Sequence, residues 1–280
     1  MPVTGIDKGT EYADYPPGGF VPAGLFSPIP LMPGDGRSLG HDSIDSGTVL
    51  GAVSLLSVLT LLNERDGYRY DRAAAEIKEA ERIAFIHLEN NHLGMYGSSS
   101  YSDVFEDGIN CRYGGELDDA SVDSACKLSA FAASGGKLSH PSRIRADDRT
   151  CANIRTMVRR TVAFLTVMGP VSRMGFEIPG AGGSRITKGT GNYITKDTVW
   201  DITVSSEPLP RDGVLKVLVR YIMCRHSDDP VLRSVKNIGL LNPRLGCAYI
   251  ADASEIDPKT VEVVERDILG YPAGSPSDRD

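Results

Sequence analysis

The chain has 280 residues, with 30 basic and 37 acidic side chains and a formal net charge of −7. A hydrophobic fraction of 41% and a charged fraction of 24% are typical of a globular protein, which excludes a disordered chain, a collagen, a coiled coil and a disulfide-dense mini-protein. The charge is unevenly distributed. Residues 137–244 carry 18 basic and 9 acidic side chains, whereas residues 1–136 carry 9 and 20. This basic middle segment indicates a polyanionic ligand or, equally, neutralisation of the acidic region within the fold.

Cysteine spacing and hydropathy indicate the class of protein. The five cysteines are widely spaced and form no CxxC pair, so we expect reduced thiols and a cytoplasmic location rather than secretion. The uncharged stretch 46–63 just reaches the length of a membrane span. Six polar residues dilute it and no aromatic belt flanks it, so we expect a buried or partner-facing helix and no membrane contact.

The N-terminal half predicts an arm followed by helices. Residues 1–45 are rich in proline and glycine and are expected to form an irregular arm. Helices are expected over 47–63 and over 70–91, while 94–124, rich in Gly, Ser, Asp and Tyr, is expected to form loops. Residues 46–146 are therefore predicted to be a mainly helical region.

From residue 147 the pattern alternates between helices and strands. The expected order is a helix, three strands, a helix, two strands and a closing helix, at 150–168, 174–178, 190–195, 198–205, 211–226, 235–241, 247–252 and 257–270. Gly169-Pro170 ends the first helix, and Asp257-Pro258 begins the last one. This order predicts an α/β (α+β) core with a mixed sheet over 147–271, and residues 272–280 are expected to be a disordered tail.

Asp201 is the residue that chemistry singles out. It lies within the expected strand 198–205, whose residues alternate between two faces. A carboxylate there needs solvent, an ion pair to Arg220 or Lys216, or a cation, because burying a lone charge is costly. Asn192, on the preceding strand, offers a second oxygen ligand for a metal.

The segment GTGNYITKDTVWDITVSSEPLPRDGVLKVLVRYIM, residues 189–223, resembles the core of the PD-(D/E)XK, or restriction-endonuclease-like, nucleases, and in particular uncharacterised prokaryotic members. The resemblance covers about 147–271 and implies a restriction-endonuclease-like mixed sheet flanked by helices, with a helical N-terminal extension. The matching residues are Asp197, Thr198, Trp200, Asp201, Val204, Ser205, Leu215, Leu218, Tyr221, Gly239, Asn242, Pro243, Arg244, Leu245, Gly270 and Tyr271.

The catalytic positions of that pattern are changed in this chain. The first strand acid falls on Asn192 and the lysine of D-x-K falls on Thr203, so only Asp201 is retained. With one carboxylate, Mg²⁺ is expected to bind weakly, on Asp201 and Asn192. We therefore expect a catalytically degenerate relative. The alternative is an active metal-dependent nuclease that uses Asp201, Glu177 and a migrated lysine, Lys216.

The basic middle segment supplies candidates for phosphate contacts. They are Arg155, Arg159, Arg160, Arg185, Lys188 and Arg220. The expected partner is nucleic acid, DNA rather than RNA, or a protein that binds the same basic face, and self-association stays open. An alternative of another class is a structural or assembly subunit that uses the apolar helix 47–63 and the proline-rich arm.

Two further patterns predict structure rather than chemistry. The glycines between 180 and 191 match neither GxGxxG nor GxxxxGK[ST], so we expect turns and not a phosphate-binding loop. His87 and His92 are five residues apart, whereas a helical metal pair needs a spacing of four, so we expect no metal site there.

Overall fold

The computed structural model describes residues 19–65, 117–133 and 143–272. The chain divides into two compact units, neither of which is continuous in sequence. The first unit comprises Met1–Pro33, Phe164–Asn242 and Cys247–Asp280, and the second comprises Gly34–Ala163 and Pro243–Gly246. The expected helix over 70–91, with His87 and His92, and the expected tail beyond Pro272 lie outside the described residues.

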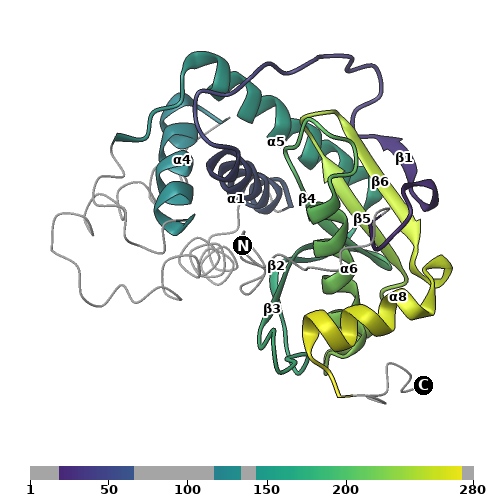
Figure 1. Ribbon diagram of the computed structural model, residues 1–280. Helices are drawn as coiled ribbons and strands as arrows, with labels where there is room; N and C mark the ends of the chain where they lie inside the picture. The colour runs from purple at the N-terminus through teal and green to yellow at the C-terminus, as the bar shows by residue number, and fades with distance from the viewer. Residues whose placement is uncertain (1–18, 66–116, 134–142, 273–280) are drawn as a thin grey trace, which may run out of the picture. The chain divides into compact units, whose positions relative to one another are not determined.

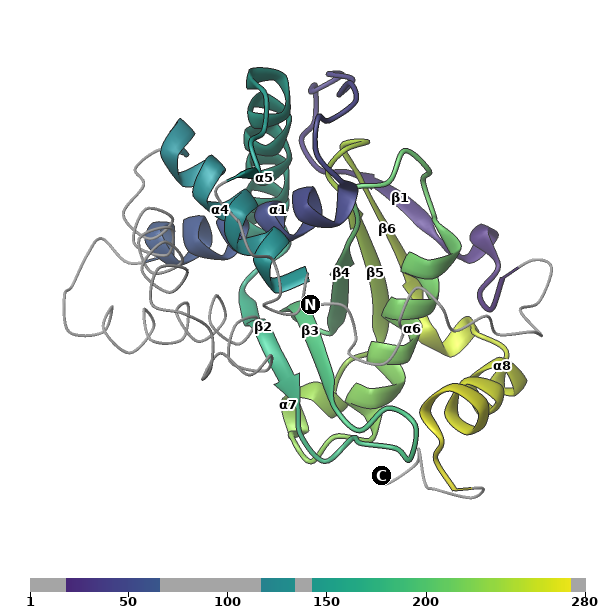
Figure 2. The same ribbon diagram turned by 60° about the vertical axis from the view of Figure 1, so that its left-hand side comes forward.

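A six-stranded mixed sheet, in the order β1-β6-β5-β4-β3-β2, forms the centre of the first unit (Figure 1). Its strands are β1 (Ser27–Pro30), β2 (Val171–Ile178), β3 (Gly189–Thr195), β4 (Thr198–Ile202), β5 (Asn237–Asn242) and β6 (Cys247–Asp252). Within this sheet β4 and β5 are the one parallel pair, and helix α6 (Arg211–Arg225) lies between them in sequence. Because a parallel pair needs a crossover, α6 lies against β3, β4 and β5 (Figure 2). The predicted mixed α/β class is confirmed.

The helices of this part of the chain begin and end where the sequence signals predict. Helix α5 (Asp148–Met168) stops immediately before Gly169-Pro170. Helix α8 (Pro258–Val263) begins after Asp257, whose carboxylate accepts a hydrogen bond from the Lys259 N–H at 3.0 Å. It continues as the π-helical segment η5 (Val264–Leu269), which ends at Gly270 with φ +76°. A one-turn helix, α7 (Pro230–Arg233), was not expected.

The first unit buries apolar residues on both faces of its sheet. Ile194 and Val199 pack with α6 residues such as Leu218 in one hydrophobic cluster. Trp200 points to the opposite face, where its ring meets Phe164 edge-on with centroids 5.1 Å apart. A Cβ added at Gly239 would lie 2.1 Å from the Trp200 ring, so glycine is what lets this ring approach β5 so closely.

Part of the N-terminal arm is regular. Strand β1 pairs antiparallel with β6, and Ser27 lies opposite Ile250. Pro28 and Pro30 are compatible with this strand because it is at the edge of the sheet, where an N–H on the outer side has no strand to bond to. Phe20 and Phe26 are buried in the core. The expectation of an irregular arm is therefore wrong for residues 27–30.

The described helices of the second unit are α1 (Ser46–Arg65), α4 (Asp119–Ala133) and most of α5. Helix α1 packs on α4, and no side chain between 48 and 61 is exposed, so the apolar stretch is a buried helix. The loop expected over 94–124 is wrong from Asp119 onward. Its Ser and Asp residues suggested turns, but α4 packs on α1 and buries Ser121 and Ser124 together with Val122. Among the described helices, none has the length and apolar character needed to cross a membrane.

Candidate functional site

Asp201, the carboxylate that the nuclease-like pattern retains, is neutralised inside the fold. Its Oδ2 forms an ion pair with Nη1 of Arg220 on α6, and the two side chains are 6% and 2% exposed. Its Oδ1 accepts the N–H of Ile202 at 2.8 Å. Arg220 also donates from Nε to the carbonyl of Thr190 on β3 at 2.8 Å. Of the three expected arrangements, the structure shows the ion pair to Arg220.

The strand register shows which other candidates lie near Asp201. The pairing of β3 with β4 runs from Thr195 and Thr198 to Tyr193 and Trp200, and Asn192 and Asp201 are the next residues along the two strands. Asn192 is half-buried. By the alternation of the two strands, both residues are on the sheet face that carries Ile194 and Val199.

Glu177 and Lys216 lie on other elements. Glu177 is an exposed residue of β2, the edge strand, and pairs with Thr190. Lys216 is half-buried on α6, about one turn before Arg220. The structure thus places the expected second acid on the strand beyond β3, and the expected lysine on the helix that supplies the partner of Asp201.

The donor set around Asp201 does not fit Mg²⁺. This ion prefers several oxygen ligands, carboxylates above all, in a near-octahedral arrangement. Within the described ranges no three His, Cys, Asp or Glu side chains are grouped so that they could hold a metal. Asp201 already contacts a cation, and Asn192 brings no charge. We therefore derive no metal-dependent step at this site.

The six basic residues expected to contact phosphate differ in exposure. Arg159, Arg185 and Lys188 are exposed, and Arg185 donates from Nη1 to the carbonyl of Asp267. Arg155, on α5, is partly buried and contacts the start of α4, where it donates to the Leu117 carbonyl at 2.7 Å and pairs with Asp119. The side chains of Arg160 and Arg220 are only 1% and 2% exposed. These two buried guanidinium groups present no surface to a ligand in this conformation.

Arg160, on α5, is the centre of a polar network in the second unit. Its Nε donates to Asp35 at 2.8 Å and its Nη2 to the carbonyl of Arg37 at 2.6 Å. Its Nη1 donates to the carbonyls of Pro243 and Arg244, at 2.8 and 3.0 Å. The hydrogen bond from Arg160 lowers the pKa of Asp35 below its ordinary value.

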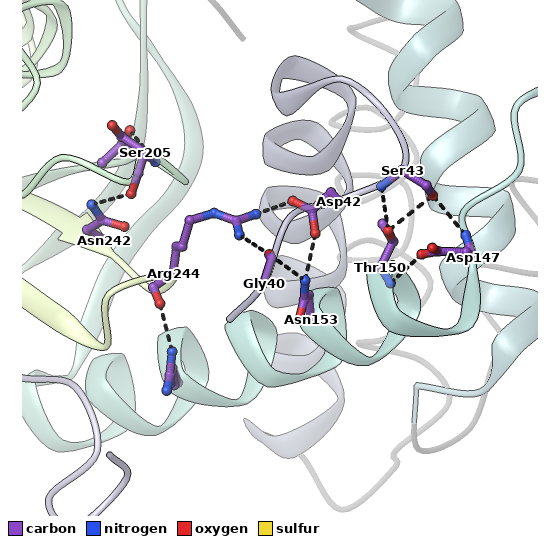
Figure 3. Close-up of polar contacts among 11 residues, drawn as sticks. Gly40, Asp42, Ser43, Asp147, Thr150, Asn153, Ser205, Asn242 and Arg244 are labelled. Atoms are coloured by element: carbon purple, nitrogen blue, oxygen red, sulfur yellow. Dashed lines mark hydrogen bonds and ion pairs between the residues drawn. The ribbon is translucent and has the colours of Figure 1, made fainter. Parts of the chain in front are cut away.

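A second arginine binds the same N-terminal segment. Arg244, in the β5–β6 turn, forms an ion pair with Asp42 and donates to the carbonyl of Gly40 at 3.0 Å (Figure 3). Asn153, on α5, donates to both of these residues, at 2.8 Å to Asp42 and 3.1 Å to Gly40. Sequence reasoning missed Asp35 and Asp42. The one signal for them was the acidic excess of residues 1–136 beside a basic segment.

The glycine-rich loop between β2 and β3 is a structural turn, as expected. Ser184 and Arg185 donate their N–H groups, each at 3.2 Å, to the carbonyls of Gly270 and Leu269 at the end of η5. The N–H of Gly183 donates to the carbonyl of Ile186 at 2.8 Å. Because these donors bond to protein carbonyls, they do not form a cradle for phosphate.

Comparisons of the chain with protein-family models, with curated proteins and with solved structures found no match.

Proposed function

We propose that this chain is a restriction-endonuclease-like protein that binds nucleic acid without cleaving it. The observation that carries the proposal is the ion pair of Asp201 with Arg220, both buried. Arginine keeps its charge at every physiological pH, so the one strand carboxylate that the nuclease pattern retains is permanently opposed by a cation. A carboxylate held in this way is a poor ligand for Mg²⁺.

The order of elements supports the fold in this proposal. In the nuclease pattern, one acid lies on a strand, D-x-K lies on the next strand, and a helix follows. Here Asn192 is on β3, Asp201 is on β4, and α6 follows. The pairing of Tyr193 with Trp200 supports a shared site, because Asn192 and Asp201 are the next residues along the two strands.

The position of the missing lysine supports the loss of catalysis. Thr203, which stands at that position, follows the end of β4 and donates its N–H to the carbonyl of Leu241 at 2.8 Å. A threonine hydroxyl cannot supply the positive charge that orients a nucleophilic water and offsets developing charge. Lys216 carries such a charge, but its helix also supplies Arg220, which occupies Asp201.

The exposed members of the basic set support nucleic acid as the ligand. Arg159, Arg185 and Lys188 reach solvent, and the segment 137–244 has a net charge of +9. Cations of this kind bind phosphates without reading the base sequence, and such binding weakens steeply with salt. The assembly alternative has less support, because the apolar helix α1 already packs on α4.

A cleavage assay tests the first half of the proposal. End-labelled single- and double-stranded DNA and RNA are incubated with the full chain and Mg²⁺ or Mn²⁺, and no metal-dependent product is expected. A product that disappears in the Asp201→Ala variant would overturn the proposal in favour of the active nuclease. A product that persists in this variant would indicate a contaminating enzyme.

A binding assay tests the second half. Fluorescence anisotropy with a labelled duplex should show an affinity that falls as salt rises. Arg159→Gln and Lys188→Gln should each weaken binding and lower the salt slope by about one unit. The matched control is Lys259→Gln, because Lys259 is an exposed cation of the acidic C-terminal segment. Salt-independent binding, or an equal loss in the control, would contradict the proposal.

A further inference from the structure

Residues 34–43, which we call the strap, belong to the second unit and are held within it by polar contacts. None of the ten residues is buried, and Gly34, Gly36 and Gly40 give the backbone high conformational freedom. By contrast Leu31, shortly before the strap, is 3% exposed and belongs to the apolar core. Leu39, the one large apolar side chain of the strap, is only half-buried, so the position of the strap depends mainly on hydrogen bonds and ion pairs.

The strap presents oxygen atoms to two arginines. The Nε and Nη2 edge of Arg160 meets the Asp35 carboxylate and the Arg37 carbonyl, while its Nη1 is held by the β5–β6 turn. Both Nη atoms of Arg244 meet the strap as well, at the Asp42 carboxylate and the Gly40 carbonyl. The donor edges of both guanidinium groups thus face strap oxygens.

These donor edges have the geometry that binds phosphate. A guanidinium edge donates two parallel hydrogen bonds to two oxygens of a carboxylate or a phosphate. Asn153 adds an amide donor to the same place (Figure 3). If the strap moved away, the donor groups of Arg160, Arg244 and Asn153 that now bond to strap oxygens would lose these acceptors. They would then form a cluster of hydrogen-bond donors that could bind an anion.

We propose that the strap covers an anion-binding site formed by Arg160, Arg244 and Asn153, and that phosphate groups compete with Asp35 and Asp42 for it. The site itself follows from the contacts of the strap. The identification of its ligand as the nucleic-acid backbone rests on the proposed function. The strap then has a regulatory role, because it covers Arg160 and Arg244 of the basic middle segment until a polyanion displaces it.

If only molecules with an open strap bind the anion, the apparent affinity for the anion is the intrinsic affinity multiplied by the fraction of molecules in which the strap is open. Asp35→Asn with Asp42→Asn removes both competing charges, so the double variant should bind inorganic tripolyphosphate about tenfold more tightly than the unmodified chain. The control Glu207→Gln with Asp212→Asn changes the net charge equally at two exposed acids of the first unit. It should leave the affinity within about twofold. Adding Arg244→Gln to the strap variant should abolish the gain.

Ser43→Ala provides a second variant in case the double variant does not fold. The Ser43 hydroxyl contacts the Thr150 hydroxyl at 3.1 Å and accepts the Asp147 N–H at 3.0 Å (Figure 3). Its loss loosens the strap and leaves both arginine sites intact, so tripolyphosphate binding should again tighten. The inference is overturned if calorimetry shows no increase in tripolyphosphate affinity in any folded strap variant, or an equal increase in the control.

A labelled DNA duplex in the same series separates the two proposals. If the strap variants bind both tripolyphosphate and DNA more tightly than the unmodified chain, the result supports the covered anion site and the proposed function together. A gain for tripolyphosphate without DNA binding by any variant supports the covered anion site and overturns nucleic acid as the ligand. DNA binding that is unaffected by the strap variants, with no gain for tripolyphosphate, overturns the strap alone.

Discussion

Arg220 on α6 bridges two strands, because its guanidinium pairs with the carboxylate of Asp201 on β4 and donates to a carbonyl on β3. The pair is almost completely buried, so its contribution to stability depends on the desolvation of both charges as well as on their attraction. The removal of one partner and the removal of both should therefore have very different effects.

Arg220→Met should lower the free energy of unfolding by about 3–5 kcal/mol, because it leaves the Asp201 charge buried without a cation. The double variant Arg220→Met with Asp201→Leu replaces the pair by apolar side chains and should recover most of that loss. Urea denaturation of the single and double variants measures the coupling. Additive losses would show that the two residues do not act as a pair, and would remove the main support for a silent site.

Gly239→Ala should destabilise the first unit, because the new Cβ would lie 2.1 Å from the Trp200 ring, within the buried sheet. Overpacking of this kind costs about 1–3 kcal/mol. Gly24→Ala is the matched control, since a Cβ there has nothing within 4 Å and should change stability by less than about 0.5 kcal/mol. Thermal unfolding of the two variants checks this, and equal melting temperatures would contradict the packing described for Trp200.

Strong local signals made the α/β core predictable from sequence. Gly169-Pro170, Asp257-Pro258 and Gly270 fix helix ends by backbone chemistry that acts within a few residues. The parallel pairing of β4 with β5 is possible because the helix between them in sequence provides the crossover that parallel strands require. Strand β1 was missed because a proline-rich segment forms a strand only when an edge such as that of β6 is available, which the local sequence does not show.

The candidate site was predictable only in part, for a related reason. Asp201 lies in a strand whose residues alternate between two faces, so this carboxylate needs a partner. Lys216 and Arg220 are four residues apart on the following helix and share one face of it, which makes them the candidates. Sequence cannot rank them, because helix rotation relative to the sheet decides which cation reaches the strand. The partners of Arg160 and Arg244 lie more than 100 residues away in the chain, at Asp35 and Asp42, so no spacing rule finds them.

Native alkylation should distinguish the cysteines by burial. Burial raises the pKa of Cys126 and that of Cys224 to about 12 each, so at pH 8 only about one thiol in 10⁴ is a reactive thiolate. Of the four cysteines within the described ranges, Cys247, at the start of β6, is the one that is half-buried rather than buried, and it should react before the other three with iodoacetamide. Mass spectrometry of the folded and urea-unfolded chain measures the site-specific rates. Labelling of Cys126 as fast as Cys247 in the folded chain would contradict the packing of α4 on α1.

The stability that Asp35 contributes should depend on pH in a defined direction. The hydrogen bond from Arg160 lowers the pKa of Asp35 in the folded chain, so its contribution is complete above the ordinary aspartate pKa and is lost as the pH falls through the lowered value. Asp35→Asn should therefore reduce the free energy of unfolding by about 2 kcal/mol at pH 7, the size of a hydrogen bond to a charged group.

The difference between Asp35→Asn and the unmodified chain should persist down to about pH 5, because the carboxyl remains ionised there in both the folded and the unfolded chain. It should then shrink as the pH falls further, since protonation removes the same charge from the unmodified chain. Urea titrations from pH 3 to pH 7 measure the difference, with Asp212→Asn as the exposed control, for which a change below about 0.5 kcal/mol is expected. A difference that stays constant across this range would show that Arg160 does not hold Asp35 as a charged partner, and the strap would then lack the electrostatic anchor on which its competition with phosphate depends.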